Sequence, residues 1–231
     1  MTNLKKTKIV YVDGFAIRNS VDPNFEIVTH RITDVSRPYP KFFIPEGEIW
    51  IDNPLRDETE FLMKIEQYYT DPKNDKEIDK FKTKGKFVDE QRSYIKKLCK
   101  KGHIPEYRKK EEKMDEITIV FVDGAVVRSY IDPEFTFGGH GHVYSYIPKG
   151  EVWIDIHMDP RETKYVVLHE VVEQKLMKDN GKSYDSAHDY AIASEKEART
   201  KDGVGNYSDY ENYKWRGLTN QEIIRKYFVI K

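Results

Sequence analysis

The sequence contains one module twice, and this repeat constrains the fold more than any other feature. IVYVDGFAIRNSVDPNF at residues 9–25 recurs without a gap as IVFVDGAVVRSYIDPEF at residues 119–135. After a loop of different length, IPEGEIWID at residues 44–52 recurs as IPKGEVWID at residues 147–155. A recurring segment of this kind is typical of chains that repeat one structural unit. The 231 residues are therefore expected to form two tandem copies of one small module.

Two fainter matches extend the repeat toward the end of each copy. TEFLMKIEQ from Thr59 aligns with TKYVVLHEV from Thr163, and GKFVDEQRSYIKKLC from Gly85 aligns with GKSYDSAHDYAIASE from Gly181. The charged stretch EYRKKEEKMDE separates the copies, and the aromatic stretch YSDYENYKWRG follows the second. The predicted domains are a first module at residues 1–112, a second module at residues 113–200 and a C-terminal tail at residues 201–231.

Each copy reads as strands followed by two helices, which predicts an α+β fold. KIVYV and ITIVFV end at Asp-Gly, which favours a hairpin turn, so AIRNS and VVRSYI are expected to be the returning strands. EIWID and EVWID alternate apolar and polar residues, as a half-buried strand does. Residues 162–178 have helical spacing, Gly181 is a helix stop, and Ser183 is a candidate cap for a second helix. The apolar face of that second helix comprises Tyr184, Ala187, Ala191 and Ile192. Each module is thus predicted to be a small antiparallel sheet followed by a helical hairpin.

The first of these helices carries LHEVVEQKLM at residues 168–177, a His-Glu-x-x-Glu pattern. On a helix, His169 and Glu173 are four residues apart and project from the same face. Zinc accepts imidazole nitrogen and carboxylate oxygen, so Glu173 can replace the second histidine of the His-Glu-x-x-His pattern of zinc peptidases. In those enzymes the glutamate after the first histidine is the general base, and here that residue is Glu170.

His188 on the second helix is the candidate third ligand. In a tight antiparallel hairpin about Gly181, Glu173 and His188 are equally far from the turn and face each other. The predicted metal ligands are therefore His169, Glu173 and His188, which leaves a fourth position open, as a catalytic zinc site requires. Glu195 is expected to accept a hydrogen bond from a ligand imidazole or to serve as an alternative ligand.

The first copy lacks all of these candidates at the aligned positions. His169, Glu173, His188 and Glu195 are replaced there by Ile65, Tyr69, Arg92 and Cys99, respectively. Only Glu66 persists, aligned with Glu170, which also allows a structural role for this glutamate. A site that works as a unit would be lost in this way, although four independent substitutions would give the same pattern. We predict a metal site in the second module alone.

The remaining histidines are weaker candidates. His140 aligns with His30 and is therefore interpreted as structural. His142 and His157 have no counterpart in the first copy and are assigned to loops, although either could line a cleft beside the metal. His103 is expected to be exposed in the linker.

Other features shared by both copies are also interpreted as structural. Trp50 and Trp153 occupy matching strand positions and are expected in the core. Turn chemistry and hydrogen bonds at strand ends explain the shared acidic positions, which are Asp13, Asp52, Asp123 and Asp155.

Composition excludes several classes of protein. Lys plus Arg (39) and Asp plus Glu (40) nearly cancel, which favours neither a nucleic-acid nor a membrane partner. Cys99 is the only cysteine, so neither an internal disulfide nor a thiolate zinc site can form. The start MTNLKKTKIVYV lacks the apolar core of a signal peptide, and no apolar run reaches membrane-spanning length. We expect a soluble protein of a reducing compartment, the cytoplasm.

The second copy resembles small zincin-like metallopeptidases found largely in phages and other mobile elements. The resemblance covers residues 119–199 and, in decayed form, residues 9–99. It rests on His-Glu-x-x-Glu, a Leu-Met pair, a glycine turn and an Ala-His on the next helix. The matching positions are His169, Glu170, Glu173, Leu176, Met177, Gly181, Ala187 and His188. The resemblance implies a zinc-binding helical hairpin with a hydrolase-like centre, and places the protein in a host cytoplasm or a virion.

Two functional interpretations remain open at this stage. In the first, the chain is a zinc-dependent hydrolase of metallopeptidase type that acts on a peptide or protein, with Glu170 activating water. In the second, it is a non-catalytic phage structural or accessory protein with a structural or vestigial metal site. Its assembly partner would then bind the first module or the aromatic tail.

Overall fold

The computed structural model describes residues 8–20, 25, 28–30, 44, 47–60, 63 and 97–204. The chain divides into two compact units, of which the second comprises Lys101–Ile131 and Phe135–Glu211. Both units contain strands, and the second contains a helical hairpin, so the predicted α+β class is confirmed. The hairpin predicted for the first module and the C-terminal tail beyond residue 204 lie outside the described residues.

The first unit contains a three-stranded sheet in the order β1-β3-β2. Its elements are β1 (Lys8–Val12), α1 (Gly14–Ser20), β2 (Val28–His30), β3 (Glu48–Asp52) and the 3-10 helix η2 (Asn53–Glu58). β1 runs parallel to β3, and β2 runs antiparallel to it.

The second unit contains a four-stranded sheet in the order β4-β5-β7-β6. Its elements are β4 (Arg108–Met114), β5 (Ile117–Val122), α5 (Gly124–Tyr130), β6 (Gly138–His140), β7 (Glu151–Asp155), α6 (Thr163–Asn180) and α7 (Tyr184–Lys201). β5 and β7 are parallel, whereas β4 and β6 pair antiparallel with their neighbours. The predicted boundary near residue 112 falls inside β4, which pairs with β5.

Both sheets are mixed and not antiparallel, because a helix follows the first strand of each repeat. The segments AIRNS and VVRSYI lie in α1 and α5, so the prediction of returning strands was wrong. Asp123 caps α5 by accepting a hydrogen bond from the Val126 amide at 3.2 Å, and Asp13 accepts one from the Ala16 amide at 3.0 Å. The Asp-Gly dipeptide therefore starts a helix here instead of closing a hairpin.

A buried ion pair fixes each of these helices to the neighbouring parallel strand. Arg18 contacts Asp52 at 2.8 Å, and Arg128 contacts Asp155 at 2.8 Å. A Cβ atom on Gly124 would lie 2.1–2.6 Å from the Asp155 carboxylate, so only glycine fits at that position. In both copies the aspartate that ends the Trp-Ile-Asp strand thus holds the helix that begins at Asp-Gly, which is a structural role, as expected for features found in both copies.

The strand pairing is also the same in the two units. Val10 pairs with Trp50, and Val120 pairs with Trp153. Both tryptophans are 1 % exposed, which confirms their predicted place in the core. GEIWID and GEVWID therefore contribute the same strand in the same register, as the repeat predicted.

Alternation along β5 divides the core of the second unit into two layers. Ile117 and Ile119 face a cluster that includes Val166 and Val171 of α6. Val120 and Val122 face the opposite cluster, which includes Trp153 and residues Val127, Phe135 and Ile147. The sheet is thus covered by α6 on one face and by α5 with its following loops on the other.

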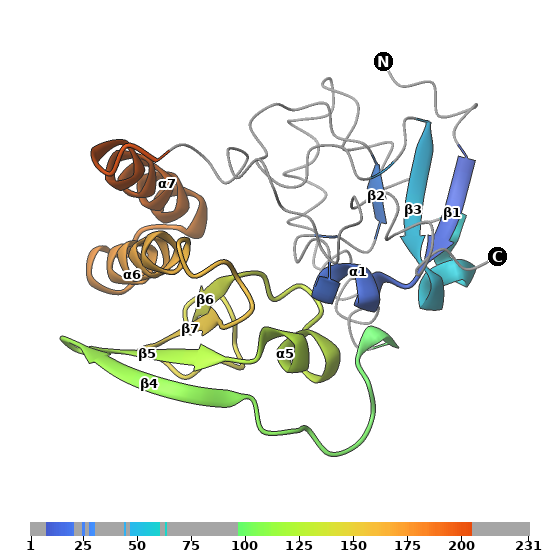
Figure 1. The fold of residues 1–231 in the computed structure, drawn as a ribbon, viewed down its shortest axis with the longest axis horizontal. Coiled ribbons are helices and arrows are strands. Elements are labelled where there is room, and N and C mark those ends of the chain that lie inside the picture. The colour runs from blue at the N-terminus through green and yellow to red at the C-terminus, as the bar shows by residue number, and fades with distance from the viewer. Residues whose placement is uncertain are drawn as a thin grey trace. The chain divides into compact units, whose positions relative to one another are not determined.

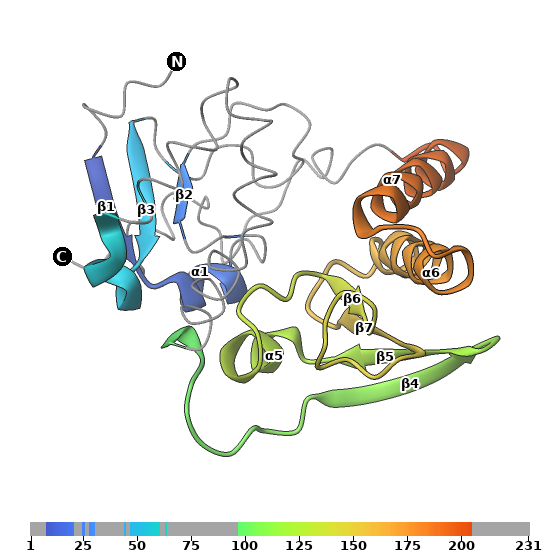
Figure 2. The ribbon, with the colours of Figure 1, turned by 180° about the vertical axis from the view of Figure 1, so that it is seen from behind.

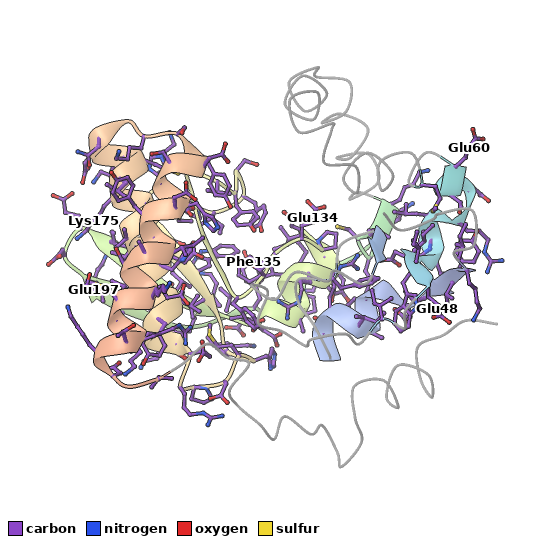
Figure 3. All side chains as sticks on the ribbon, turned by 90° about the horizontal axis from the view of Figure 1, so that it is seen from above. Glu48, Glu60, Glu134, Phe135, Lys175 and Glu197 are labelled. Atoms are coloured by element: carbon purple, nitrogen blue, oxygen red, sulfur yellow. The ribbon has the colours of Figure 1, made fainter. Side chains whose placement is uncertain are left out.

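The helical hairpin lies outside this sheet, with α6 between the strands and α7 (Figures 1 and 2). Ala187 and Ala191 of α7 are buried, as predicted, whereas Tyr184 and Ile192 are exposed. Lys175 on α6 and Glu197 on α7 are exposed side chains of the hairpin (Figure 3).

Candidate metal centre

A tight turn sets the register of α6 against α7. Gly181 ends α6 in the left-handed conformation (φ 61°), which glycine adopts at little cost, and its amide donates to the Leu176 carbonyl. Ser183 then caps α7 by accepting a hydrogen bond from the Ser186 amide. Both turn residues act as predicted, so Glu173 and His188 face each other across the hairpin.

Three candidate ligand atoms converge between the two helices. His188 Nδ1 lies 2.8 Å from Glu173 Oε2 and 3.1 Å from His169 Nε2, and His169 Nε2 lies 3.6 Å from Glu173 Oε2. In a tetrahedral zinc site with bonds of roughly 2.0–2.1 Å, neighbouring ligand atoms are about 3.3 Å apart. The three separations lie on both sides of that value, so the group could hold a metal ion without large movements.

The solvent exposure of the three candidate ligands shows from which side solvent reaches them. Glu173 is 4 % exposed, His169 is 13 % exposed and His188 is 38 % exposed. Tyr184 stacks on the His188 ring, with centroids 5.3 Å apart and planes inclined by 25°. Solvent therefore reaches the group beside His188, while Glu173 forms its buried wall.

Both oxygens of Glu173 are occupied by imidazole nitrogens. Oε2 faces His188 and His169, and Oε1 lies 2.9 Å from Nε2 of His140, which is fully buried. Burial alone would raise the pKa of Glu173, but hydrogen bonds from the three histidines lower it far below its usual range. Glu173 is therefore the ionised centre of the group.

Glu195 orients the His169 ring through Nδ1, the nitrogen that does not face the other candidate ligands. Its Nδ1 lies 3.1 Å from Glu195 Oε2, while Arg199 donates to Glu195 Oε1 at 2.8 Å and also pairs with Glu162. Burial lowers the pKa of His169, but the hydrogen bonds to Glu173 and Glu195 outweigh it and raise the pKa to about 10. Glu195 thus occupies the orienting position predicted for it.

Glu170 lies beside this group but is not one of its hydrogen-bonded members. Its carboxyl is close to His140 and Glu173, with one ligand atom of each residue within 4.8 Å of the others. The structure gives the Glu170 carboxyl no hydrogen bond with any residue that it describes. Burial raises the pKa of Glu170 to about 8, and the Glu173 charge adds to this while His169 opposes it.

The structure brings His169, Glu170, Glu173, His188 and Glu195 together, as the sequence predicted. Sequence reasoning missed His140, because that position is also a histidine in the first copy and was interpreted as structural. The glycines before it were the available signal, because Gly138 and Gly139 stand where the first copy has Val28 and Thr29.

The other histidines lie where they were expected. His157 is in a loop, about half exposed, and contacts Asp123 at 3.0 Å. His103 is exposed, and His142 is partly buried in the turn after β6. None of the three belongs to the two groups of candidate ligands found among the described residues.

The chain matches no protein-family model, no curated protein and no solved structure. Within the part of the chain that the structure describes, no helix is long and apolar enough to cross a membrane. The fold and the site therefore define the protein as an α+β protein with a buried histidine–carboxylate group of metal-ligand type.

Proposed function

We propose that the second unit is a zinc-dependent hydrolase of metallopeptidase type. The observation that carries the proposal is the convergence of His169 Nε2, Glu173 Oε2 and His188 Nδ1, at separations of 2.8–3.6 Å. Three protein ligands with an open position are typical of catalytic zinc sites, whereas structural sites usually have four. The partial exposure of His188 gives a substrate a side from which to approach.

The donor types favour zinc over magnesium and calcium. Two imidazole nitrogens with one carboxylate suit zinc, whereas magnesium and calcium prefer oxygen ligands alone. The single cysteine, Cys99, rules out a thiolate set within one chain. A zinc ion supplies Lewis acidity, which polarises a scissile carbonyl and makes a water molecule acidic enough to lose a proton near neutral pH.

The charges of the site also favour a cation. Three carboxyl groups, of Glu170, Glu173 and Glu195, lie on the same side of the hairpin, and Arg199 offsets one of them. Buried carboxylates need a compensating charge, which a proton or a metal ion can provide. A divalent ion between His169 and His188 would supply that charge.

Glu170 is the residue that we assign to proton transfer. Its carboxyl lies beside Glu173 and accepts no hydrogen bond from the described residues. A pKa of about 8 keeps it protonated near neutral pH in the metal-free chain, and a cation at Glu173 would lower that pKa so that the carboxylate can take a proton from water. Proton uptake by a carboxylate at hydrogen-bonding reach of the attacking water is the usual function of such a group. The proton would then pass to the leaving amine of a cleaved peptide bond.

A peptide or protein substrate is the part of the proposal that rests on the zincin-like pattern of residues 168–188. The alternative is a metal that fastens α6 to α7 in an assembly protein, because His169 and His188 come from different helices. Turnover separates the two functions, since a purely structural metal would leave Glu170 without a catalytic role.

Metal analysis of the purified full chain tests the site directly. We expect about one zinc ion per wild-type chain, little in His169→Ala, and the wild-type amount in His103→Ala, which removes an exposed histidine elsewhere. Equal metal in the two variants, or none in the wild type, would refute the centre. Mass spectrometry of a peptide library incubated with the zinc-loaded chain then tests hydrolysis.

A further inference from the structure

We propose that His140 is a positioning residue that holds Glu173 so that one carboxylate oxygen faces the metal. The inference rests on the proposed metal centre and adds a member that was not among the predicted residues. His140 donates from Nε2 to Glu173 Oε1 at 2.9 Å, which leaves Oε2 beside His188 and His169. The contact is fully buried at the histidine, so solvent does not compete for it.

The geometry of β6 explains why this strand supports the site. Alternate strand residues point to the same face, so Gly138 and His140 both face α6. A Cβ atom on Gly138 would lie 2.8 Å from Glu170 Cγ, and His140 contacts Glu173. Glu170 and Glu173 are three residues apart on α6, which brings them to the same side of the helix. The short strand β6 thus lies against both Glu170 and Glu173.

The hydrogen bond at the other ring nitrogen sets the tautomer of His140. The His142 amide donates to His140 Nδ1 at 3.3 Å. A neutral imidazole has one donor and one acceptor nitrogen, so the proton lies on Nε2. Nε2 is therefore a donor to Glu173 and has no lone pair to offer to a metal.

This tautomer decides between one metal ion and two. His140, Glu170 and Glu173 form a second group of candidate ligands that shares Glu173 with the first. A metal bound there would require an unprotonated Nε2 and a proton on Nδ1, which would point at the His142 amide hydrogen. The observed contact favours a single ion held by His169, Glu173 and His188, with His140 outside its ligand set.

Metal titrations of the full chain and its variants test the positioning role. Loss of a hydrogen bond behind a metal ligand typically costs about 10–100-fold in affinity, so His140→Ala should weaken zinc binding by that factor at an unchanged stoichiometry. His140→Gln should regain most of the affinity, because its amide places an N–H donor near the position of Nε2. His30→Ala, at the equivalent register position opposite Ile49, should bind zinc as the wild type does.

The absorption spectrum of bound cobalt provides a readout that a general loss of stability would not change. We expect His140→Ala to alter the spectrum and His140→Gln to restore it toward that of the wild type. Unchanged affinity and spectrum in His140→Ala, or equal losses in both variants, would overturn the inference while leaving the proposed centre intact. Two ions in the wild type and one in His140→Ala would make His140 a ligand instead. A wild-type chain without metal would overturn the proposed centre and this inference together.

Discussion

Nε2 of His169 and Nδ1 of His188 lie 3.1 Å apart although the two residues belong to different helices. Because Glu195 faces Nδ1 of His169, the neutral form that binds a metal would keep its proton there and offer Nε2 to the space beside His188. The two rings thus present nitrogen atoms to a shared space that Glu173 closes from the buried side. Substitutions around this space should separate metal binding from proton transfer.

Glu170→Gln and Glu173→Gln should differ in metal content, because only Glu173 is a proposed ligand. Glu170→Gln should retain zinc and reduce turnover by about 10²–10⁴-fold, because it removes the proton acceptor without removing a ligand. Glu173→Gln should lower the affinity for zinc by more than about 10–100-fold, because it removes a charged ligand oxygen. That range is typical for the loss of a residue that only hydrogen-bonds a metal ligand. Equilibrium zinc titration and peptide cleavage by the zinc-loaded protein measure the two effects.

Glu66→Gln is the matched control for Glu170→Gln, because Glu66 occupies the aligned position in the copy without ligands. It should leave both zinc content and turnover unchanged. If Glu66→Gln and Glu170→Gln lower the melting temperature equally and neither alters turnover, the glutamate has a structural role and the assignment of Glu170 fails.

Gly138→Ala should reduce turnover while leaving the metal in place. The added methyl group would lie 2.8–2.9 Å from Glu170 and Val166, so the Glu170 side chain must move, whereas Glu173 is held by His140. Steady-state kinetics of the zinc-loaded variant measure the effect, which should appear in kcat more than in KM.

Gly139→Ala controls for the loss of a strand glycine. Its methyl group would meet the ring of Tyr144, on the opposite face of β6 from Glu170. We expect a lower melting temperature for this variant but a normal kcat in the protein that remains folded. Equal kcat values in Gly138→Ala and the wild type would show that Glu170 does not depend on this contact.

Arg199→Met should destabilise the hairpin strongly. Arg199 is 5 % exposed and pairs with both Glu162 and Glu195, so its removal takes a buried cation away from two carboxylates. Breaking a buried pair in this way typically costs about 3–5 kcal/mol of unfolding free energy. Chemical denaturation of the metal-free protein measures this loss.

The exposed pair of Lys201 and Glu197 serves as the comparison, since it has the same helical spacing at 71 % and 68 % exposure. Lys201→Met should change the unfolding free energy far less than Arg199→Met does, because solvent screens an exposed pair. Comparable losses in Arg199→Met and Lys201→Met would show that the buried network does not stabilise α6 against α7.

Zinc should stabilise the second unit alone. Arg18→Met and Arg128→Met remove equivalent buried cations, and each should reduce protection from hydrogen exchange in its own unit. A ligand stabilises the folded state that binds it, so zinc should restore part of the hydrogen-exchange protection that Arg128→Met loses around β7. Exchange around β3 in Arg18→Met should be the same with zinc or with chelator, and a zinc effect there would contradict the placement of the ligands.

The hairpin and most of the metal group could be predicted because their signals are local. Gly181 and Ser183 fix the turn, and the helical period then determines which residues oppose each other. Glu173 and His188 are 15 residues apart, yet counting from the turn was sufficient to pair them. Metal binding, the identity of the metal and the substrate are not encoded in that geometry, so they remain proposals.

The strand order and the role of His140 depend on contacts between distant residues. Asp-Gly fits a hairpin turn and a helix start equally well, and the choice is made by the Asp155 carboxylate, 31 residues after Gly124. His140 contacts a glutamate 33 residues away, which no local pattern indicates. A histidine shared by two copies was therefore interpreted as structural, although its partner in the second copy, Glu173, is aligned with Tyr69 in the first.

The glycine at position 138 has a consequence for any attempt to engineer a second centre in this chain. β2 and β6 have the same register, and Val28 stands where Gly138 lies against Glu170. Grafting the histidines and the glutamate onto the first repeat would therefore leave a valine at the register position where a glycine makes room for Glu170 in the second. A transplanted site would require Val28→Gly as well, so the minimum set of changes is larger than the ligand set.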